Sequence, residues 1–213
     1  MIHIDPKEWG KAENYKFLTS AVIPRPIAYV TSVSKEGVLN AAPFSYFNVV
    51  SAEPPILMVS IGRKNGVQKD TARNILEQGE FVVHMVTESN VKKVNRSAMA
   101  LPPEESEVTR FKLNPEPSRF VSVPSLKDAP VRIECVLEKH LVFEEGESAT
   151  DVIFGRIVQY VLDEKVAGKG ESETGIVVKP KKAKVIGRLG GNRYIKQGKI
   201  FSLKRPVYKP KKR

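Results

Sequence analysis

The segment IAYVTSVSKEGVLNAAPFSYFNVVSA, residues 27–52, most constrains what this chain can fold into. It consists of two runs rich in β-branched and aromatic residues, separated by the tetrapeptide SKEG. Gly37 can adopt the positive φ that a tight hairpin turn requires, so the two runs are predicted to pair as antiparallel strands. A third strand over residues 56–61 follows the break at Pro54 and Pro55. The chain is therefore expected to begin as an antiparallel sheet.

The remainder of the chain adds further strands and only short helices. A helix is predicted from Asp70, as its N-cap, to Gly79, which favours the left-handed conformation that ends helices. A second helical stretch over residues 89–99 ends before Pro102 and Pro103. Further strands are predicted over residues 81–86, 130–144 and 151–163. At least seven strands with two or three helices indicate a mainly β fold, a barrel with helices packed outside it.

Residue composition limits the class of protein. The single cysteine, Cys135, excludes an internal disulfide framework and a cysteine-cluster metal site, and the three histidines show no ligand spacing. The N-terminal segment lacks the apolar core of a signal peptide, and the longest apolar run is too short to span a bilayer. We therefore expect a cytoplasmic protein with one domain over residues 1–198 and a basic C-terminal tail over 199–213.

The net charge of +11 leaves two interpretations open. Seven of the 35 Lys and Arg residues lie in the tail, and a positive surface attracts nucleic acid, a membrane surface or a phosphorylated cofactor. A basic tail with two prolines is more often an unstructured terminus, and the chain contains no recognised nucleic-acid-binding motif. A basic nucleic-acid-binding module without a cofactor is therefore the alternative from another class of function.

Several common catalytic motifs are absent from the sequence. It contains no GxxxxGK[ST] loop, no GxGxxG after a strand, no HExxH and no GxSxG. Ordinary nucleotide, zinc-hydrolase and serine-hydrolase interpretations therefore have no support. Two other segments have the residues of a ligand site.

The first segment is NAAPFSYFN, residues 40–48. Pro43 cannot donate to a strand ladder, so the strand is expected to bulge or to lie at an edge there. Neighbouring amides would then be free to face a ligand, beside the polar side chains of Asn40 and Ser45. The alternative is that the two phenylalanines of the segment are core residues, as such aromatic residues usually are.

The second segment is IGRKNGVQKDTARN, residues 61–74. Lys69, Thr71 and Arg73 cluster where a helix is predicted to begin, and the unpaired N–H groups of a helix N-terminus suit a phosphate. The alternative is a capped helix start in a basic protein.

The motifs PRPIA, NAAPFSYF, PP, KDT and EFVV follow one another in that order, and EESEV and RLGGNRY occur further along the chain. This ordered series resembles the flavin reductase-like family of FMN-binding split-barrel proteins, which includes flavoredoxins and archaeal ferric reductases. The resemblance covers most of the chain. It implies a six-stranded antiparallel split barrel with Greek-key connections and a few flanking helices. It also implies a homodimer with FMN near the subunit interface.

The resemblance further implies which residues bind the cofactor. The flavin ring and ribityl chain would be lined by Tyr29, Val30, Thr31, Ser32, Asn40, Ala41, Ala42, Pro43, Phe44, Ser45, Tyr46 and Phe47. The phosphate end would be held by Ser60, Ile61, Lys69 and Thr71, and Tyr194 would close over the flavin. No metal and no covalent catalytic residue is expected.

The expected function is that of an FMN-dependent oxidoreductase. It would pass reducing equivalents from NADH or NADPH through flavin N5 to an acceptor such as flavin, ferric iron or a partner protein. A flavoredoxin-type electron carrier without its own NAD(P)H activity is the alternative within the same family. A further alternative is a protein that keeps this fold but binds FMN loosely or has lost it.

Overall fold

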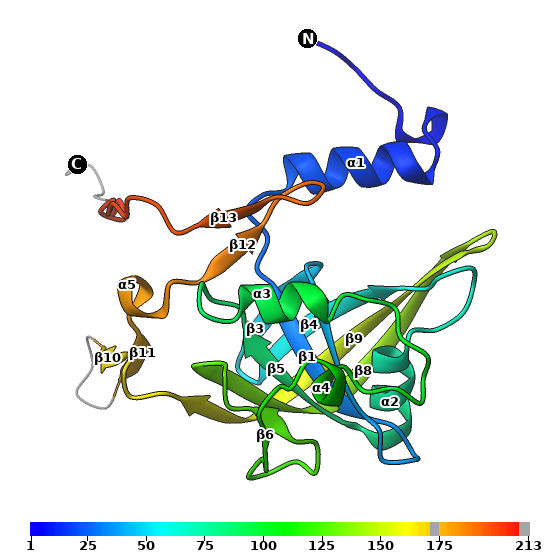
Figure 1. Ribbon diagram of the computed structural model, residues 1–213. Helices are drawn as coiled ribbons and strands as arrows, with labels where there is room; N and C mark the ends of the chain where they lie inside the picture. The colour runs from blue at the N-terminus through cyan, green and yellow to red at the C-terminus, as the bar shows by residue number, and fades with distance from the viewer. Residues whose placement is uncertain (171–174, 209–213) are drawn as a thin grey trace.

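The computed structural model describes residues 1–170 and 175–208, and residues 209–213 of the predicted tail lie outside this part (Figure 1). The main sheet has seven strands, all antiparallel to their neighbours: β1 (Ala28–Val33), β2 (Leu39–Phe44), β3 (Phe47–Ala52), β4 (Pro55–Gly62), β5 (Glu80–Met85), β8 (Val131–Glu145) and β9 (Ser148–Leu162). Short pairs are formed by β6 (Pro115–Glu116) with β7 (Ser125–Leu126), β10 (Ala167–Lys169) with β11 (Ile176–Val178), and β12 (Ile186–Arg188) with β13 (Tyr194–Lys196). The helices are the 3-10 helix η1 (Pro6–Glu8), α1 (Lys11–Ala21), α2 (Asp70–Gln78), α3 (Val91–Arg96), α4 (Glu107–Arg110) and α5 (Pro180–Ala183).

The order of strands in the main sheet is β2-β1-β5-β8-β9-β4-β3. Its two edges, β2 and β3, are separated in sequence only by Ser45 and Tyr46. The chain pairs with β1 before this break and with β4 after it, and the Ser60 amide donates to the Tyr46 carbonyl at 2.8 Å. The sheet therefore curls into a barrel, with the break where the chain changes partner (Figure 1).

The main sheet has seven strands rather than the six that the resemblance implies, because the stretch expected to form one interrupted strand is divided at Ser45 and Tyr46 into β2 and β3. Pro43 lies on edge strand β2, as its missing N–H requires. The predicted long strands correspond to β8 and β9, which form one hairpin. Gly37, with φ 83°, occupies the turn between β1 and β2 as predicted.

Two apolar cores lie on opposite faces of β1. Ala28 and Val30 point into the barrel, where they pack with side chains from the other strands of the main sheet and from α2. Ile27 and Tyr29 point outward and pack beneath α3 and α4. This alternation follows from the two-residue period of a strand.

Helix α2 has the predicted C-terminus at Gly79, with φ 75°, but its N-cap is Lys69 rather than Asp70. Asp70 is the first helical residue, and its carboxylate accepts from Arg73 one turn later instead of capping the helix. Helix α3 is shorter than the predicted 89–99 stretch. Among the described residues, no helix combines the length and apolar character needed to cross a membrane.

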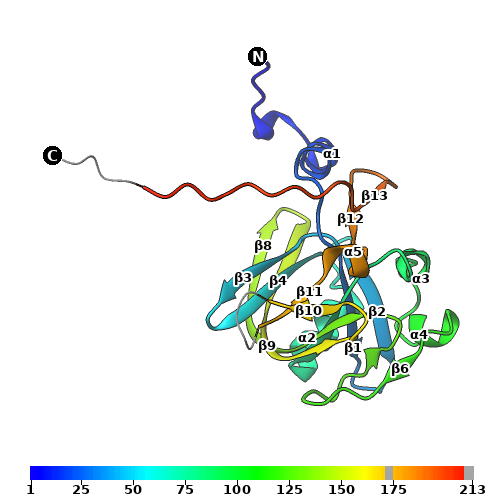
Figure 2. The same ribbon diagram turned by 90° about the vertical axis from the view of Figure 1, so that its left-hand side faces the viewer.

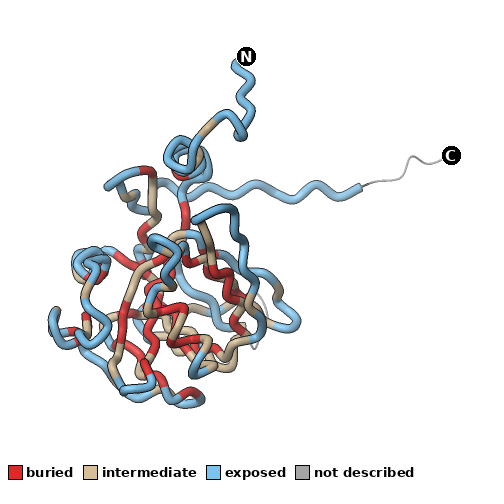
Figure 3. The backbone as a smooth tube through the Cα atoms, turned by 90° about the vertical axis from the view of Figure 1, so that its right-hand side faces the viewer, coloured by how far each residue is buried: buried red, intermediate tan, exposed pale blue. Residues whose placement is uncertain are grey.

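Two segments project from the barrel. The N-terminal arm, residues 1–22, contains α1, which buries only Thr19, and the C-terminal arm, residues 197–208, runs away from the body without secondary structure (Figure 2). Buried residues concentrate in the barrel, while both arms are almost wholly exposed (Figure 3). Arg25 holds the base of the N-terminal arm, donating to the carbonyls of Thr19 at 2.7 Å, Val22 at 2.9 Å and Leu189 at 3.2 Å.

Candidate functional site

The candidate site is a cavity of about 540 Å³ beside edge strand β2. Its walls come from β2, from the loop between β4 and α2, from the first turn of α2, and from the segment after α3. Its lining residues are Asn40, Ala42, Pro43, Phe44, Lys64, Asn65, Val67, Gln68, Lys69, Asp70, Thr71, Arg73, Ser97, Ala98, Met99, Ala100, Leu101, Pro103 and Glu107. The size falls within the range of small-molecule sites in proteins.

One side of this cavity is basic. The Nζ atom of Lys69 lies 5.6 Å from the centre of the Phe44 ring, and burial, together with the nearby charge of Lys64, lowers the Lys69 pKa. Within the part of the chain that the structure describes, neither lysine forms an ion pair. Helix α2 also begins here without a side-chain cap, so its first N–H groups and its dipole add to the positive end. An anion bound at this end would relieve the repulsion between the lysines.

A buried polar network forms the inner wall. The Thr71 hydroxyl donates to Asn40 Oδ1 at 2.8 Å, and Asn40 Nδ2 donates to Glu107 Oε2 at 3.1 Å. Glu107 Oε2 also accepts from the Ala41 amide at 3.0 Å. Because β2 is an edge strand, this carboxylate takes the place of a missing strand partner. Burial raises the pKa of Glu107, although hydrogen bonds from the backbone amides of Ala41 and of Glu107 itself, and from the Asn40 side chain, oppose the shift.

The loop between β4 and α2 is anchored from behind by the Asp151 cluster, which comprises Asp151, Arg63, Gln68 and His140. Asp151 on β9 has no exposed surface. It accepts from Arg63 Nε at 2.9 Å and Arg63 NH2 at 2.8 Å, and from Gln68 Nε2 and His140 Nε2, both at 2.9 Å. Although burial raises the pKa of this carboxyl, the hydrogen bonds from Arg63, Gln68 and His140 lower it to about 2. The cluster therefore fixes the loop that carries Lys64 and Lys69.

The structure brings together six of the residues predicted to bind a cofactor. The six that line the cavity are Asn40, Ala42, Pro43, Phe44, Lys69 and Thr71. They come from the two segments that the sequence singled out, which meet where the Thr71 hydroxyl donates to Asn40 Oδ1.

The other predicted residues are placed elsewhere. Val30, Phe47 and Ile61 lie in the barrel core, and Thr31 donates to the Pro124 carbonyl. Ser32 and Ala41 lie behind the lining, in contact with Asn40 and Glu107 respectively. Ser45 accepts from Arg25 at 3.4 Å, and Ser60 and Tyr46 join the strands at the barrel break. Tyr194 donates to Asn95, with the Arg188 guanidinium 4.5 Å from its ring centre.

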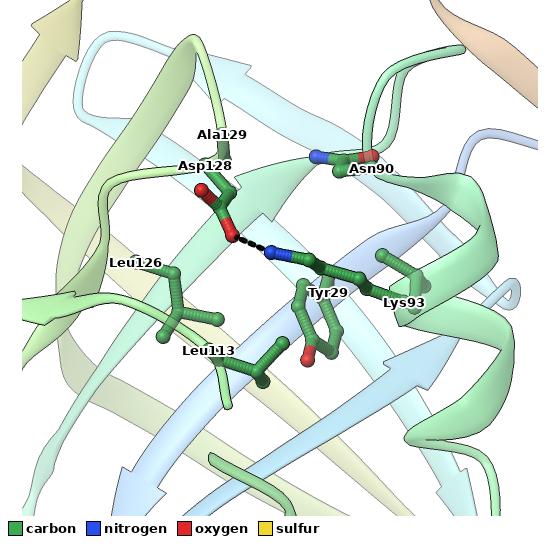
Figure 4. A pocket seen from close by; sticks show the side chains of 8 residues that line it. Tyr29, Asn90, Lys93, Leu113, Leu126, Asp128 and Ala129 are labelled. Atoms are coloured by element: carbon green, nitrogen blue, oxygen red, sulfur yellow. Dashed lines mark hydrogen bonds and ion pairs between the residues drawn. The ribbon is translucent and has the colours of Figure 1, made fainter. Parts of the chain in front are cut away.

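Tyr29 is also outside the cavity lining, on the outer face of β1. It borders a small separate cavity beneath α3, beside the Lys93–Asp128 ion pair (Figure 4). Its hydroxyl lies 2.8 Å from Ser97 Oγ, and its ring meets His84 edge-on. Burial raises the Tyr29 pKa, so the phenol stays neutral.

His84 is a residue of β5 whose ring is fully buried. Its Nδ1 lies 2.8 Å from the Tyr29 carbonyl, and its Nε2 accepts from the Leu126 amide at 2.8 Å. Burial lowers the His84 pKa to about 4, so the ring is neutral. Cys135 is buried in the barrel core, and burial raises its thiol pKa. In the described part of the chain, no group of His, Cys, Asp or Glu is arranged to hold a metal ion.

Sequence reasoning missed part of the lining. The segment 97–103 and Glu107 reach the cavity only because the chain returns to β2 after α3. The motif EESEV contains Glu107, but nothing in its spacing indicates that it faces Asn40, which is 67 residues earlier.

The lining residues fit a ligand with a flat amphipathic part and an anionic end. Ala42, Phe44, Met99 and Leu101 supply apolar surface, Asn40 supplies an amide, and Lys69 stands at the open helix terminus. FMN has these parts: a ring system, a polyhydroxyl chain and a phosphate. The hydrogen-bonding groups and the charge of the cavity lining therefore fit FMN.

Comparison with known proteins gives consistent matches. The family model for the flavin reductase like domain matches residues 20–175. The uncharacterised protein YwrF of Bacillus subtilis is 48% identical over 91% of this chain and 94% of its own length. Nitrilotriacetate monooxygenase component B from Bacillus cereus is 46% identical, with a TM-score of 0.90 over 95% of this chain and 98% of that one. The 2-nitrobenzoate 2-nitroreductase NbaA of Pseudomonas fluorescens is 32% identical, with a TM-score of 0.86 over 98% of both chains.

Proposed function

Because the chain belongs to the flavin reductase-like domain family, we propose that it is an FMN-dependent oxidoreductase that passes reducing equivalents from NADH or NADPH to an acceptor. The observation that supports this most strongly is the cavity, in which an open helix terminus and two lysines that form no ion pair with any described residue stand beside an apolar wall. Bound FMN would supply the hydride and electron transfer, at N5 of its ring.

The proposed phosphate end lies at the start of α2. Lys69 and Lys64 supply positive charge, and the first N–H groups of the helix donate hydrogen bonds. The Thr71 hydroxyl hydrogen is already committed to Asn40. Thr71 therefore contributes its backbone amide to the phosphate, and its side chain orients Asn40.

The proposed ring site lies against β2 and the segment after α3. Phe44, Ala42, Met99 and Leu101 exclude water from the apolar faces of the ring, while Asn40 binds the polar chain between the two ends. These residues bind and orient the cofactor, and the reaction needs no covalent catalyst from the protein.

The relatives support two kinds of acceptor. Nitrilotriacetate monooxygenase component B is named as one component of a monooxygenase, which supports a partner protein as the destination of the electrons. The 2-nitrobenzoate 2-nitroreductase supports direct reduction of an organic molecule. A flavoredoxin-type carrier remains the alternative if the protein has no NAD(P)H activity of its own.

The flavin content and the NAD(P)H oxidation rate of the purified protein test this proposal. We expect a yellow protein from which acid releases FMN rather than FAD, and which oxidises NADH or NADPH faster than free FMN does. A rate equal to that of free FMN would leave only the carrier role. A colourless protein that takes up no added FMN would overturn the proposal.

We also propose that the protein works as a homodimer in which the arms contact the second copy. Large apolar side chains are exposed on both arms, and Phe201 is 77% exposed. Charge is complementary as well: residues 1–174 hold 21 basic and 24 acidic residues, whereas residues 175–213 hold 14 basic and no acidic residues. The positive segment 175–213, which includes the C-terminal arm, is therefore attracted to the mildly negative remainder of another copy.

Deletion of residues 199–213 tests both the dimer and the nucleic-acid alternative. We expect light scattering of the full chain to give the mass of a dimer. The truncated chain should dissociate into monomers at a higher protein concentration than the full chain does, because its dimer is weaker. A nucleic-acid role would instead show salt-sensitive binding of oligonucleotides by the full chain, lost on truncation.

A further inference from the structure

Glu107 is a buried carboxyl in the cavity wall, and its hydrogen bonds to neighbouring residues all go to one oxygen. Its residue is 4% exposed, and its Oε2 accepts from Asn40 Nδ2 at 3.1 Å and from the Ala41 amide at 3.0 Å. Within the described residues, no neighbouring side chain donates to Oε1, while the residue lines the cavity. The second oxygen is therefore the polar atom of Glu107 that is left for a ligand.

The hydrogen-bond pattern shows which oxygen would carry a proton. Oε2 already accepts two N–H groups, so it acts as the carbonyl oxygen of the acid, and a proton would reside on Oε1. Burial raises the pKa of this carboxyl, so Glu107 is protonated to a greater extent than an exposed glutamate at the same pH. A protonated Glu107 would present an O–H donor to the cavity.

The charged groups around Glu107 do not hold it in the ionised form. Asp70 at the start of α2 raises its pKa, and that aspartate is itself paired with Arg73. On α4, Arg110 is paired with Glu105, and the Tyr29 phenol on β1 is neutral. Lys69 and Lys64 stand at the phosphate end, where the proposed cofactor would neutralise them.

We propose that Glu107 is the proton donor for the reduction of an organic acceptor in this cavity, an inference that rests on the proposed function. Reduction of a quinone by NAD(P)H converts NAD(P)H, one proton and the quinone to NAD(P)⁺ and the hydroquinone. The hydride carries two electrons and one proton. The second proton comes from Glu107: the Oε1–H bond breaks, an O–H bond forms on the quinone oxygen, and solvent reprotonates the carboxylate.

Two acceptors separate proton delivery from electron transfer. Menadione needs the extra proton, whereas ferricyanide accepts single electrons and no proton. In Glu107→Gln the amide preserves the shape and can still accept from Ala41 and Asn40, but it cannot deliver a proton. We expect the ratio of the menadione rate to the ferricyanide rate to fall about 100-fold in this variant, the scale of general acid catalysis.

Glu105→Gln is the matched control, because Glu105 lies just before α4, two residues from Glu107, is exposed and pairs with Arg110 outside the cavity lining. Its acceptor ratio should equal that of the unaltered protein. An unchanged ratio in Glu107→Gln, with FMN bound, would overturn the role of Glu107 while leaving the proposed function intact. Failure of the unaltered protein to bind FMN would overturn both.

A measurement without turnover gives a second test. In an infrared pH titration of the FMN-loaded protein, we expect a protonated-carboxyl band that persists above the ordinary glutamic acid range and is missing from Glu107→Gln. If this variant does not fold, the titration of the unaltered protein still decides: loss of every such band by the ordinary range would overturn the proposal.

Discussion

Asp151 and Glu107 are two buried carboxyls that support different parts of the cavity wall, the β4–α2 loop and strand β2, yet their surroundings differ. Asp151 faces a guanidinium, an amide and an imidazole, which together occupy both of its oxygens. Glu107 faces two neutral N–H donors through a single oxygen. The pKa of the first is lowered to about 2, and that of the second is raised.

This difference shows how one cavity can contain both a carboxylate that holds its neighbours in place and a carboxyl that is able to exchange a proton with a ligand. A buried charge with a full set of partners stays ionised and holds its neighbours in place, whereas a buried carboxyl with a spare oxygen moves towards the protonated form. The Asp151 cluster fixes the loop that carries the lysines. Glu107 leaves a polar atom for the ligand.

The largest expected effect is that of Asp151→Asn. Removal of one partner of a buried ion pair leaves Arg63 without its counter-charge, so the free energy of unfolding should fall by about 3 kcal/mol, the lower end of the usual range. We place it there because the Arg63 side chain is 22% exposed and can be partly hydrated. Urea denaturation measures this change.

The control is Glu138→Gln on the same hairpin. Glu138 forms a bidentate pair with Arg156 at the surface, where water screens the charges, so its loss should change the free energy of unfolding far less than Asp151→Asn does. Equal losses in the two variants would show that the Asp151 cluster is no stronger than a surface pair.

The next effect is a pH dependence of opposite sign for the two carboxyls. Because the pKa of Asp151 falls from 3.8 to about 2 on folding, its contribution is present above pH 3.8 and disappears as the pH falls towards 2. The corresponding free energy is about 2 kcal/mol. The pKa of Glu107 is raised above 4.5, so its contribution is complete below pH 4.5 and is lost as the pH rises through its folded pKa.

Unfolding curves between pH 2 and 8 check both signs. The difference between the unaltered protein and Asp151→Asn should shrink on acidification. For Glu107→Gln the variant should gain relative to the unaltered protein as the pH rises. Parallel curves for both variants would contradict the comparison.

The smallest expected effect concerns a buried polar group that does not border the cavity. Tyr29→Phe removes the hydrogen bond to Ser97 and should lower the free energy of unfolding by about 1 kcal/mol. The affinity for FMN should not change, because the residue is outside the cavity lining. A marked loss of FMN affinity without a loss of stability would show that Tyr29 contributes to FMN binding, as the family resemblance implies.

The sequence predicted the strands better than the faces they present. Turn residues such as Gly37, and the apolar alternation of the long hairpin, indicated where strands begin, end and pair. The two-residue period predicts that Tyr29 and Val30 point to opposite faces, but not which face is the barrel interior. That choice depends on closure of the sheet, which pairs β2 with β1 and β3 with β4.

The part of the cavity lining that follows α3 could not be predicted for a related reason. Local patterns identified the segments around Asn40 and Lys69, because proline and helix-start signals act within a few residues. Glu107 joins these segments through a hydrogen bond with Asn40, which lies 67 residues earlier in the sequence. The Asp70 N-cap prediction failed because a nearby Arg73 competes for the same carboxylate.

The central claim is that this cavity binds FMN with the phosphate at the start of α2. Calorimetric titration with FMN and with riboflavin, which lacks the phosphate, tests it most directly. We predict one FMN per chain and an affinity for riboflavin that is at least about tenfold lower, as expected for loss of charge-assisted hydrogen bonds. Lys69→Ala should reduce that preference. Equal affinities for the two flavins, or no binding of FMN, would contradict it.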